Sequence, residues 1–247
     1  MNDTEITTLP TIYCILITGK NEDRYKFIPI ALENFRLQTY KNKKLLVINH
    51  GKRKLFPNKN DNKDVIEIMF EKTKNFTLGD MRNFSISMVP YNSIFCIFDD
   101  DDYRHPRFIE LLYKEMEKNE ADVVFFKNRI DYNINTNFAY RSKFDKGMPF
   151  ILARKIDNIK YLSKDSLEDI RLHLDYDIQN KKIHIINNDP RWYIRLIHGT
   201  NTSLFVDNDK KSIVNYSDES KYHEFILTEK ERVYADEIIK KNFKSII

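Results

Sequence analysis

Short apolar segments alternate with longer amphipathic ones through the first half of the 247-residue chain. The short segments are rich in β-branched and aromatic residues, and the long ones repeat apolar residues at helical spacing. This alternation is typical of strands that are joined by crossover helices and form a parallel sheet. It predicts strands at residues 11–18, 44–49, 65–70, 93–98 and 123–128, and helices at residues 25–38, 80–89 and 107–118.

The second half of the chain is less regular. Its pattern predicts strands at residues 150–154, 182–186 and 192–198, and a helix at residues 167–179. From residue 217 onward the chain is highly charged with apolar residues at helical spacing, which predicts helices packed across the main domain. We therefore expect one Rossmann-like α/β domain with a mostly parallel central sheet at residues 1–215, and a C-terminal helical extension at residues 216–247.

Composition narrows the class of protein. Apolar residues make up 41% of the chain, which is enough for a sizeable core, and no apolar run approaches the about 20 residues of a membrane-spanning helix. The first ten residues lack the features of a secretory signal, so we expect a soluble, cytoplasmic protein. Cys14 and Cys96 lie inside apolar strands and are predicted to be buried thiols. A net charge of +4 suits an anionic substrate without requiring nucleic acid.

Four consecutive aspartates, Asp99–Asp102, follow the predicted strand at residues 93–98. Ligands of open α/β sheets bind outside the carboxyl ends of the strands. Neighbouring carboxylates repel one another unless a cation or a hydrogen-bond network compensates them, and Mg²⁺ or Mn²⁺ prefers oxygen ligands. The run therefore predicts a metal site for a phosphorylated ligand. The alternative is a solvated acidic turn before the helix that begins near Pro106.

The usual glycine-rich phosphate loops are missing from the chain. Neither GxxxxGK[ST] nor GxGxxG follows the first predicted strand, which argues against P-loop enzymes and dinucleotide-dependent dehydrogenases. A nucleoside diphosphate that is held through a metal ion fits the remaining pattern.

Between about residues 11 and 205, several segments resemble the inverting family 2 glycosyltransferases in that family's order. The opening strand, helix and second strand of the family resemble CILITGKNEDRYKFIPIALENFRLQTYKNKKLLVINHG. Its later motifs resemble LGDMRNFSI, IFDDDDYRHPRFIELL, LEDIRL and YIRLIHGTNTS. The resemblance implies an A-type glycosyltransferase fold and transfer from a nucleotide sugar, with UDP as the expected nucleotide. It also implies Mn²⁺ or Mg²⁺ as cofactor and inversion of the sugar configuration.

The resemblance also assigns roles to single residues. Asp169 is expected to be the catalytic base, and Asp101 and His198 are expected to bind the metal ion. The residues expected to bind the nucleotide sugar are Thr18, Asn21, Asn49, Arg82, Asp99 and Asp100. Four successive aspartates allow the metal motif to shift by one residue. Where the family commonly has Asp-Asp-Gly-Ser, this chain has Asn49-His50-Gly51-Lys52, so recognition of the base is left open.

Other interpretations of these residues stay open. Ser166 and Asp169 have the spacing of a helix capping box, His198 suits a buried core histidine, and Arg82 suits a polar helix start. At the level of function, the alternatives are a sugar-nucleotide nucleotidyltransferase, for which Gly19-Lys20 with Arg24 is a poor signature, and a catalytically inactive binding relative. The acceptor is a glycan, a glycoprotein or another hydroxyl compound, with modified DNA kept because residues 52–63 are basic.

Overall fold

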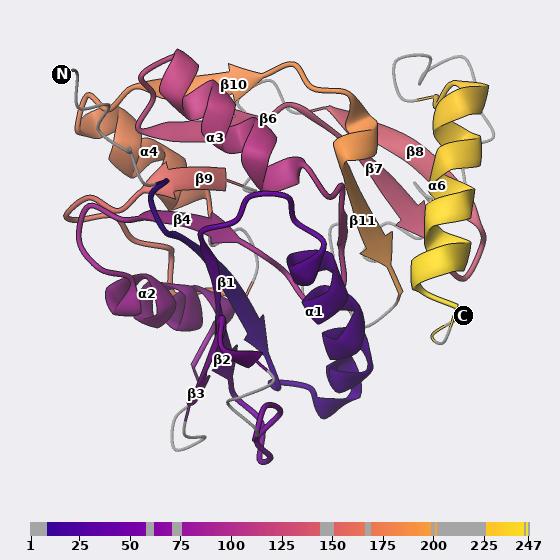
Figure 1. Ribbon diagram of the computed structural model, residues 1–247, viewed down its shortest axis with the longest axis horizontal. Helices are drawn as coiled ribbons and strands as arrows, with labels where there is room; N and C mark the ends of the chain where they lie inside the picture. The colour runs from indigo at the N-terminus through magenta and orange to yellow at the C-terminus, as the bar shows by residue number, and fades with distance from the viewer. Residues whose placement is uncertain are drawn as a thin grey trace, which may run out of the picture.

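The computed structural model describes residues 9–57, 62–70, 76–143, 151–165, 169–198, 201, 226–244 and 246. Within them the chain forms two sheets, which α-helices cover (Figure 1). None of the helices in this described part is long and apolar enough to span a membrane.

The larger sheet has seven strands in the order β10-β6-β9-β4-β1-β2-β3. Every neighbouring pair is parallel except those of β9, which runs antiparallel to β4 and to β6. The mostly parallel sheet that the sequence predicts is therefore confirmed. Its strands are β1 (Ile12–Thr18), β2 (Lys43–Asn49), β3 (Val65–Met69), β4 (Ile94–Ile97), β6 (Val123–Phe126), β9 (Ile151–Arg154) and β10 (Ile183–Ile186).

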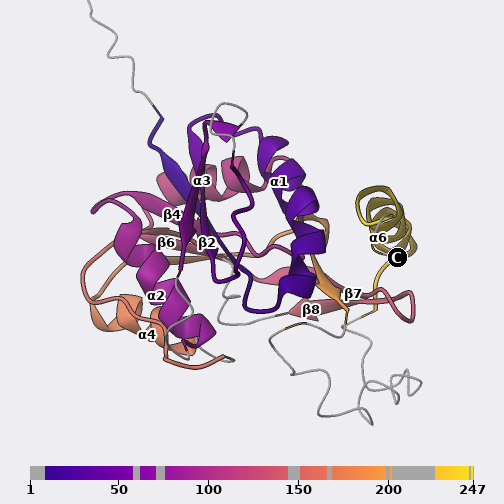
Figure 2. The ribbon, with the colours of Figure 1, turned by 90° about the horizontal axis from the view of Figure 1, so that it is seen from below.

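Helices cover both faces of this sheet, as crossover connections require. On one face, α1 (Ile28–Arg36) and α3 (Phe108–Lys118) pack on a cluster that includes Cys14 and Cys96, both fully buried as predicted. On the other face, α2 (Leu78–Met88) and α4 (Ile170–Ile178) pack on alternate residues of the same strands (Figure 2).

The smaller sheet has the order β5-β11-β7-β8. Its strands are β5 (Tyr103–Arg104), β7 (Asn128–Asn133), β8 (Phe138–Lys143) and β11 (Tyr193–Ile197). Sequence analysis predicts β11 but misses β7 and β8. The reason is that β7 buries polar residues, including Arg129 and Asp131, so its pattern lacks the alternation of a half-buried strand.

Helix α6 (Glu229–Asn242) covers the smaller sheet, with Ala235, Ile239 and Phe243 packed against Ile130 and Leu196. A capping box of Thr228 and Glu231 begins the helix. This helix confirms the helical pattern expected there. The expected domain boundary at residue 215 lies outside the described residues and stays a prediction.

Two glycines bring the ends of β1 and β2 together. Gly19 has a φ of +87°, and a Cβ atom there would lie 2.4 Å from the backbone nitrogen of Gly51. A Cβ atom on Gly51 would lie 1.5 Å from the hydroxyl oxygen of Tyr25. Only glycine fits this close approach. Thr18 and Asn49, which are paired in the sheet, therefore end their strands side by side.

Candidate active site

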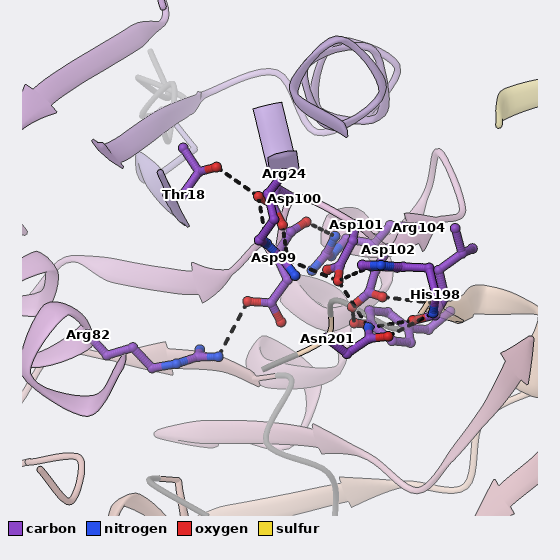
Figure 3. A network of polar contacts seen from close by, with 12 residues as sticks. Thr18, Arg24, Arg82, Asp99, Asp100, Asp101, Asp102, Arg104, His198 and Asn201 are labelled. Carbon is purple, nitrogen blue, oxygen red and sulfur yellow. Dashed lines mark hydrogen bonds and ion pairs between the residues drawn. The ribbon is translucent and has the colours of Figure 1, made fainter. Parts of the chain in front are cut away.

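The aspartate run Asp99–Asp102 joins the two sheets. It leaves the carboxyl end of β4 in the large sheet and leads directly into β5, which pairs with β11 in the small sheet. Asp100, Asp101 and Asp102 are buried, whereas the Asp99 side chain is 25% exposed. This burial contradicts the alternative of a solvated acidic turn. Figure 3 shows the four carboxylates and their partners from distant parts of the chain.

Asp100 and Asp101 share one guanidinium group, that of Arg24. Its Nη2 atom contacts a carboxylate oxygen of Asp100 and lies 2.9 Å from Oδ2 of Asp101. Arg24 belongs to a 3₁₀ helix (Glu22–Phe27) that follows β1, and Asn21 caps this helix by accepting from the nitrogen of Asp23. Sequence analysis did not assign Arg24 to the aspartates, because a single arginine in a loop carries no motif.

Thr18 and His198 complete the contacts of this pair. The Thr18 hydroxyl donates to Oδ2 of Asp100 at 2.9 Å. His198 Nε2 lies 3.0 Å from Oδ2 of Asp101, and the Asn201 amide donates to the same oxygen at 3.2 Å. Asn201 also accepts from the backbone nitrogen of His198 at 2.8 Å, which holds the end of β11 in place. The structure therefore brings the two predicted metal ligands together.

Asp102 has a structural role. It accepts hydrogen bonds from the hydroxyl of Tyr193 and, at 3.1 Å, from the nitrogen of Leu196, both in β11. Burial raises the pKa of Asp102 to about 7, and the neighbouring charges of Asp101 and Asp99 act in the same direction. The buried Arg104 guanidinium lies 4.1 Å from the centre of the Phe98 ring, and its Nη1 donates to the carbonyl of Asp99.

Burial raises the pKa values of Asp100 and Asp101, whereas the charge of Arg24 lowers them. Burial raises the pKa of Asp100 to about 6, because it outweighs the attraction of Arg24. Burial also opposes the charge of Asp101, yet Arg24 and the hydrogen bond from His198 outweigh it and hold the pKa of this carboxyl well below its usual range. Asp101 is therefore the most firmly ionised member of the buried part of the run, which suits a metal ligand.

Arg82, Asp99 and Asp169 form the second part of the site. Arg82 lies on α2, whose first turn is fixed by a capping box of Thr77 and Asp80. The Nη2 atom of Arg82 donates to Oδ1 of Asp99 at 3.3 Å. Burial raises the pKa of Asp169, while Arg82 lowers it and Asp99 raises it. Asp169 is therefore within electrostatic range of Arg82 and Asp99.

Asp169 stands at the start of α4 in a way that differs from the capping-box alternative. The helix begins at Ile170, so Asp169 occupies the N-cap position, whereas the box would put it at the third helical position. Its side chain makes no capping hydrogen bond within the described residues. Ser166, the other member of the expected box, lies outside them.

Two residues that the resemblance assigns to nucleotide binding have internal roles. Asn21 caps the 3₁₀ helix, and the amide of Asn49 fills its four hydrogen-bonding positions within the protein. One of these bonds runs from Asn49 Nδ2 to Oε1 of Glu67 at 2.8 Å. An aspartate at position 49 would repel the Glu67 carboxylate, which here accepts from the Asn49 amide. A direct contact of either residue with the nucleotide stays a prediction.

The donor groups fit a divalent cation. The described residues contain no group of three or more histidine, cysteine, aspartate or glutamate side chains arranged for a metal ion. Asp101 and His198 nevertheless present a carboxylate and an imidazole 3.0 Å apart, a set that suits Mn²⁺. Ions of this class commonly take one or two protein ligands and complete their shell with water and substrate phosphates.

Comparison with known proteins identifies the family of this chain. Residues 14–169 match the family described as Glycosyl transferase family 2. A search of curated proteins finds no match. Among solved structures, residues 1–349 of S. aureus TarS match with a TM-score of 0.58 and 14% identity over 76% of this chain and 60% of that chain. The same TarS fragment in complex with UDP-GlcNAc matches with a TM-score of 0.58 and 15% identity over 78% and 60%.

The present chain thus spans 60% of the length of the TarS fragment that it matches. At this level of identity the likeness shows the fold, which is the A-type glycosyltransferase fold expected from the sequence. The family match covers more than half of the chain, from the buried Cys14 to the predicted base Asp169, and it includes the whole aspartate run. This protein belongs to glycosyl transferase family 2.

Proposed function

We propose that this protein transfers a sugar from a UDP-sugar to an acceptor hydroxyl, with inversion at the anomeric carbon and with Mn²⁺ or Mg²⁺ at the aspartate run. The observation that carries the proposal is the meeting of two groups at the carboxyl ends of the strands. One is Asp101 with His198, and the other is Asp99 with Arg82 and Asp169. Family membership and the fold shared with TarS support the same chemistry.

On the donor side, Asp101 and His198 would hold the cation, which when bound neutralises charge on the leaving diphosphate. Thr18 keeps Asp100 in place, and Asn201 does the same for His198. Arg82 adds a positive charge beside Asp99, the most exposed carboxylate of the run. This arrangement would hold the diphosphate at the strand ends while the sugar extends toward Asp169.

On the acceptor side, Asp169 would act as the general base. It accepts the proton of the acceptor hydroxyl while that oxygen forms the new bond to the anomeric carbon, and the bond from this carbon to the diphosphate oxygen breaks. Attack opposite the leaving group inverts the configuration. Because burial raises the pKa of Asp169, the carboxylate is a stronger base than an exposed aspartate.

The position of Arg24 argues against the nucleotidyltransferase alternative. That class needs basic residues after the first strand for phosphate binding, and here Arg24 is turned onto Asp100 and Asp101. A catalytically inactive relative would bind a nucleotide sugar without turning it over. Asp169 and the Asp101–His198 pair support turnover.

Calorimetric titration with UDP, GDP and their sugar conjugates, first with Mn²⁺ and then with EDTA, tests the proposal. We expect one nucleotide to bind with Mn²⁺, and binding to be lost with EDTA and in Asp101→Ala. Asp23→Ala is the matched control, since Asp23 is exposed on the 3₁₀ helix beside the site. The proposal fails if no nucleotide binds in any condition. Binding that persists unchanged with EDTA and in Asp101→Ala would remove the metal role alone.

The acceptor class is tested separately by salt dependence. Binding of an acceptor glycan is expected to change little with ionic strength. A DNA acceptor would instead show log K falling against log salt by about 0.9 for each phosphate contact. Lys52, Arg53 and Lys54 are exposed in the basic segment, so Lys52→Gln combined with Lys54→Gln would flatten that slope if DNA were the acceptor.

A further inference from the structure

The guanidinium of Arg24 lies where a cation that binds the aspartate run would lie. It bridges Asp100 and Asp101 and so contacts the carboxylate of Asp101 that also faces His198. Asp100 and Asp101 thus both form ion pairs with the charge of Arg24. Two cations at this point would repel one another strongly, because the site is shielded from water.

The side chains of Arg24, Asp101 and Asp100 differ in their exposed fraction. The Arg24 side chain is 13% exposed, that of Asp101 is 8% exposed, and that of Asp100 is 1% exposed. Arg24 is therefore the most exposed of the three side chains, and its guanidinium contacts both carboxylates.

The carboxylates keep other partners that do not depend on Arg24. Thr18 donates to Asp100, while Asn201 and His198 contact Asp101. Arg24 itself stands on a short 3₁₀ helix, whose hydrogen-bond geometry is weaker than that of an α-helix. The run can therefore keep its shape when the guanidinium leaves.

We propose that Arg24 is a built-in competitor of the divalent cation. In the free protein its guanidinium occupies the position at Asp101 where the ion would bind, and the ion displaces it. The inference rests on the proposed metal use of the aspartate run. Its consequence is that the free protein compensates part of the charge of its buried carboxylates without metal. It also means that the intrinsic affinity of the aspartates for the ion is higher than the affinity that the intact protein shows.

Direct measurement of Mn²⁺ binding tests this proposal without any activity assay. The electron paramagnetic resonance signal of free Mn²⁺ would be followed during titration of wild type, Arg24→Gln and Arg24→Lys. We expect Arg24→Gln to bind Mn²⁺ about tenfold more tightly or better, which corresponds to about 1.4 kcal/mol of competition removed. Arg24→Lys should fall between the two, since an ammonium group lacks the planar fork that spans two carboxylates.

Arg107→Gln is the matched control. It removes the same charge from a half-exposed arginine that pairs with Glu110 at the surface of α3, so its Mn²⁺ affinity should equal that of wild type. Should Arg24→Gln fail to fold, Arg24→Lys keeps the charge and tests the proposal alone. In thermal melts, Mn²⁺ should raise the melting temperature of the Arg24 variants more than that of wild type.

Equal or weaker Mn²⁺ binding by both Arg24 variants would overturn the proposal. So would the lack of Mn²⁺ binding by wild type and variants alike. If UDP-sugar binding persisted in that case, nucleotide-sugar transfer would stand and only the metal role and this inference would fall. Tighter Mn²⁺ binding by the variants in a protein that bound no nucleotide would support the inference and overturn the proposed function.

Discussion

The imidazole Nε2 of His198 lies 3.0 Å from Oδ2 of Asp101, a residue 97 positions earlier in the chain. The contact forms because β11 pairs with β5, the strand that directly follows the aspartate run. Each buried aspartate of the run faces a different partner, while the register of the metal motif stays a prediction. Asp101 is the member that faces His198, while Asp100 faces Thr18 and Asp102 faces Tyr193.

Replacement of His198 tests whether this contact serves metal binding. We expect His198→Gln to weaken Mn²⁺-dependent donor binding by about 10-fold to 100-fold, the range found when a partner in a metal site is lost. His105→Gln is the control, because His105 packs on Trp192 and contacts none of the aspartate side chains within the described structure. Calorimetry with the UDP-sugar would show unequal losses. Equal losses in both variants would assign His198 to packing.

Asp169→Asn tests the proposed base. Turnover should fall by about 10²-fold to 10⁴-fold while donor binding stays unchanged, because the amide cannot accept the acceptor proton. The exposed Asp177 on the same helix provides the control variant Asp177→Asn. Steady-state kinetics combined with calorimetry separate the two effects. A loss of donor affinity as large as the loss of turnover would count against a role in the chemical step.

The pH profile gives an independent test of Asp169. The base works when deprotonated, and burial raises its pKa, so kcat/KM should fall as the pH is lowered through a value above about 3.9, that of an ordinary aspartate. Asp169→Asn should lack this acid limb. A profile that keeps the limb in the variant would assign it to another group.

Asp102 makes stability depend on pH. Its pKa in the folded protein is about 7, above that of an unfolded aspartate, so the folded state binds its proton more tightly. The stabilisation is complete below the unfolded value and is lost as the pH rises toward 7. In EDTA, we expect the free energy of unfolding to fall between pH 5 and 7, with a slope of up to about 1.4 kcal/mol per pH unit for this group.

Asp102→Asn should reduce that slope, because an amide does not titrate. Urea unfolding at several pH values would measure the difference between the variant and wild type. Asp100, with a raised pKa of about 6, contributes in the same direction and leaves part of the slope in place. Identical slopes in the variant and wild type would mean that Asp102 does not hold its proton.

Phe243 tests how firmly α6 is attached to the domain. Its side chain is 0% exposed in the cluster beneath the small sheet, so Phe243→Ala should destabilise the protein by about 3–5 kcal/mol. Val233 on α6 is 49% exposed, and Val233→Ala should change stability by less than about 0.5 kcal/mol. Chemical denaturation measures both. Similar small effects would show that the C-terminal helix packs loosely.

Sequence analysis predicts the large sheet well because its central strands are buried on both faces and therefore form continuous apolar runs, as in Ile94–Ile97. It misses β7 and β8 of the small sheet, where Arg129 pairs with Asp131 in the interior of β7. In the sequence alone, polar residues that pair with one another inside the folded protein have the same pattern as polar residues in a surface loop.

The site shows the same division. The resemblance to family 2 assigns Asp101 and His198 to the same predicted metal site, since both lie in recognisable motifs, and the structure shows them in contact. It gives no indication of Arg24, whose role depends on how a 3₁₀ helix turns its side chain back toward the strand ends. It also assigns Asn49 to the nucleotide, whereas the structure shows its amide bonded to Tyr25, Gly51, Arg53 and Glu67.

The aspartate run is bounded by strands that are paired in different sheets, β4 with β1 and β9, and β5 with β11. Its length is therefore as constrained as its composition. Inserting or deleting one residue would exchange the faces of β5 on which the Tyr103 and Arg104 side chains lie. It would also move every later carboxylate away from its partner. In natural variation or in engineered libraries, this segment should accept some changes of residue type, while changes of length should be eliminated.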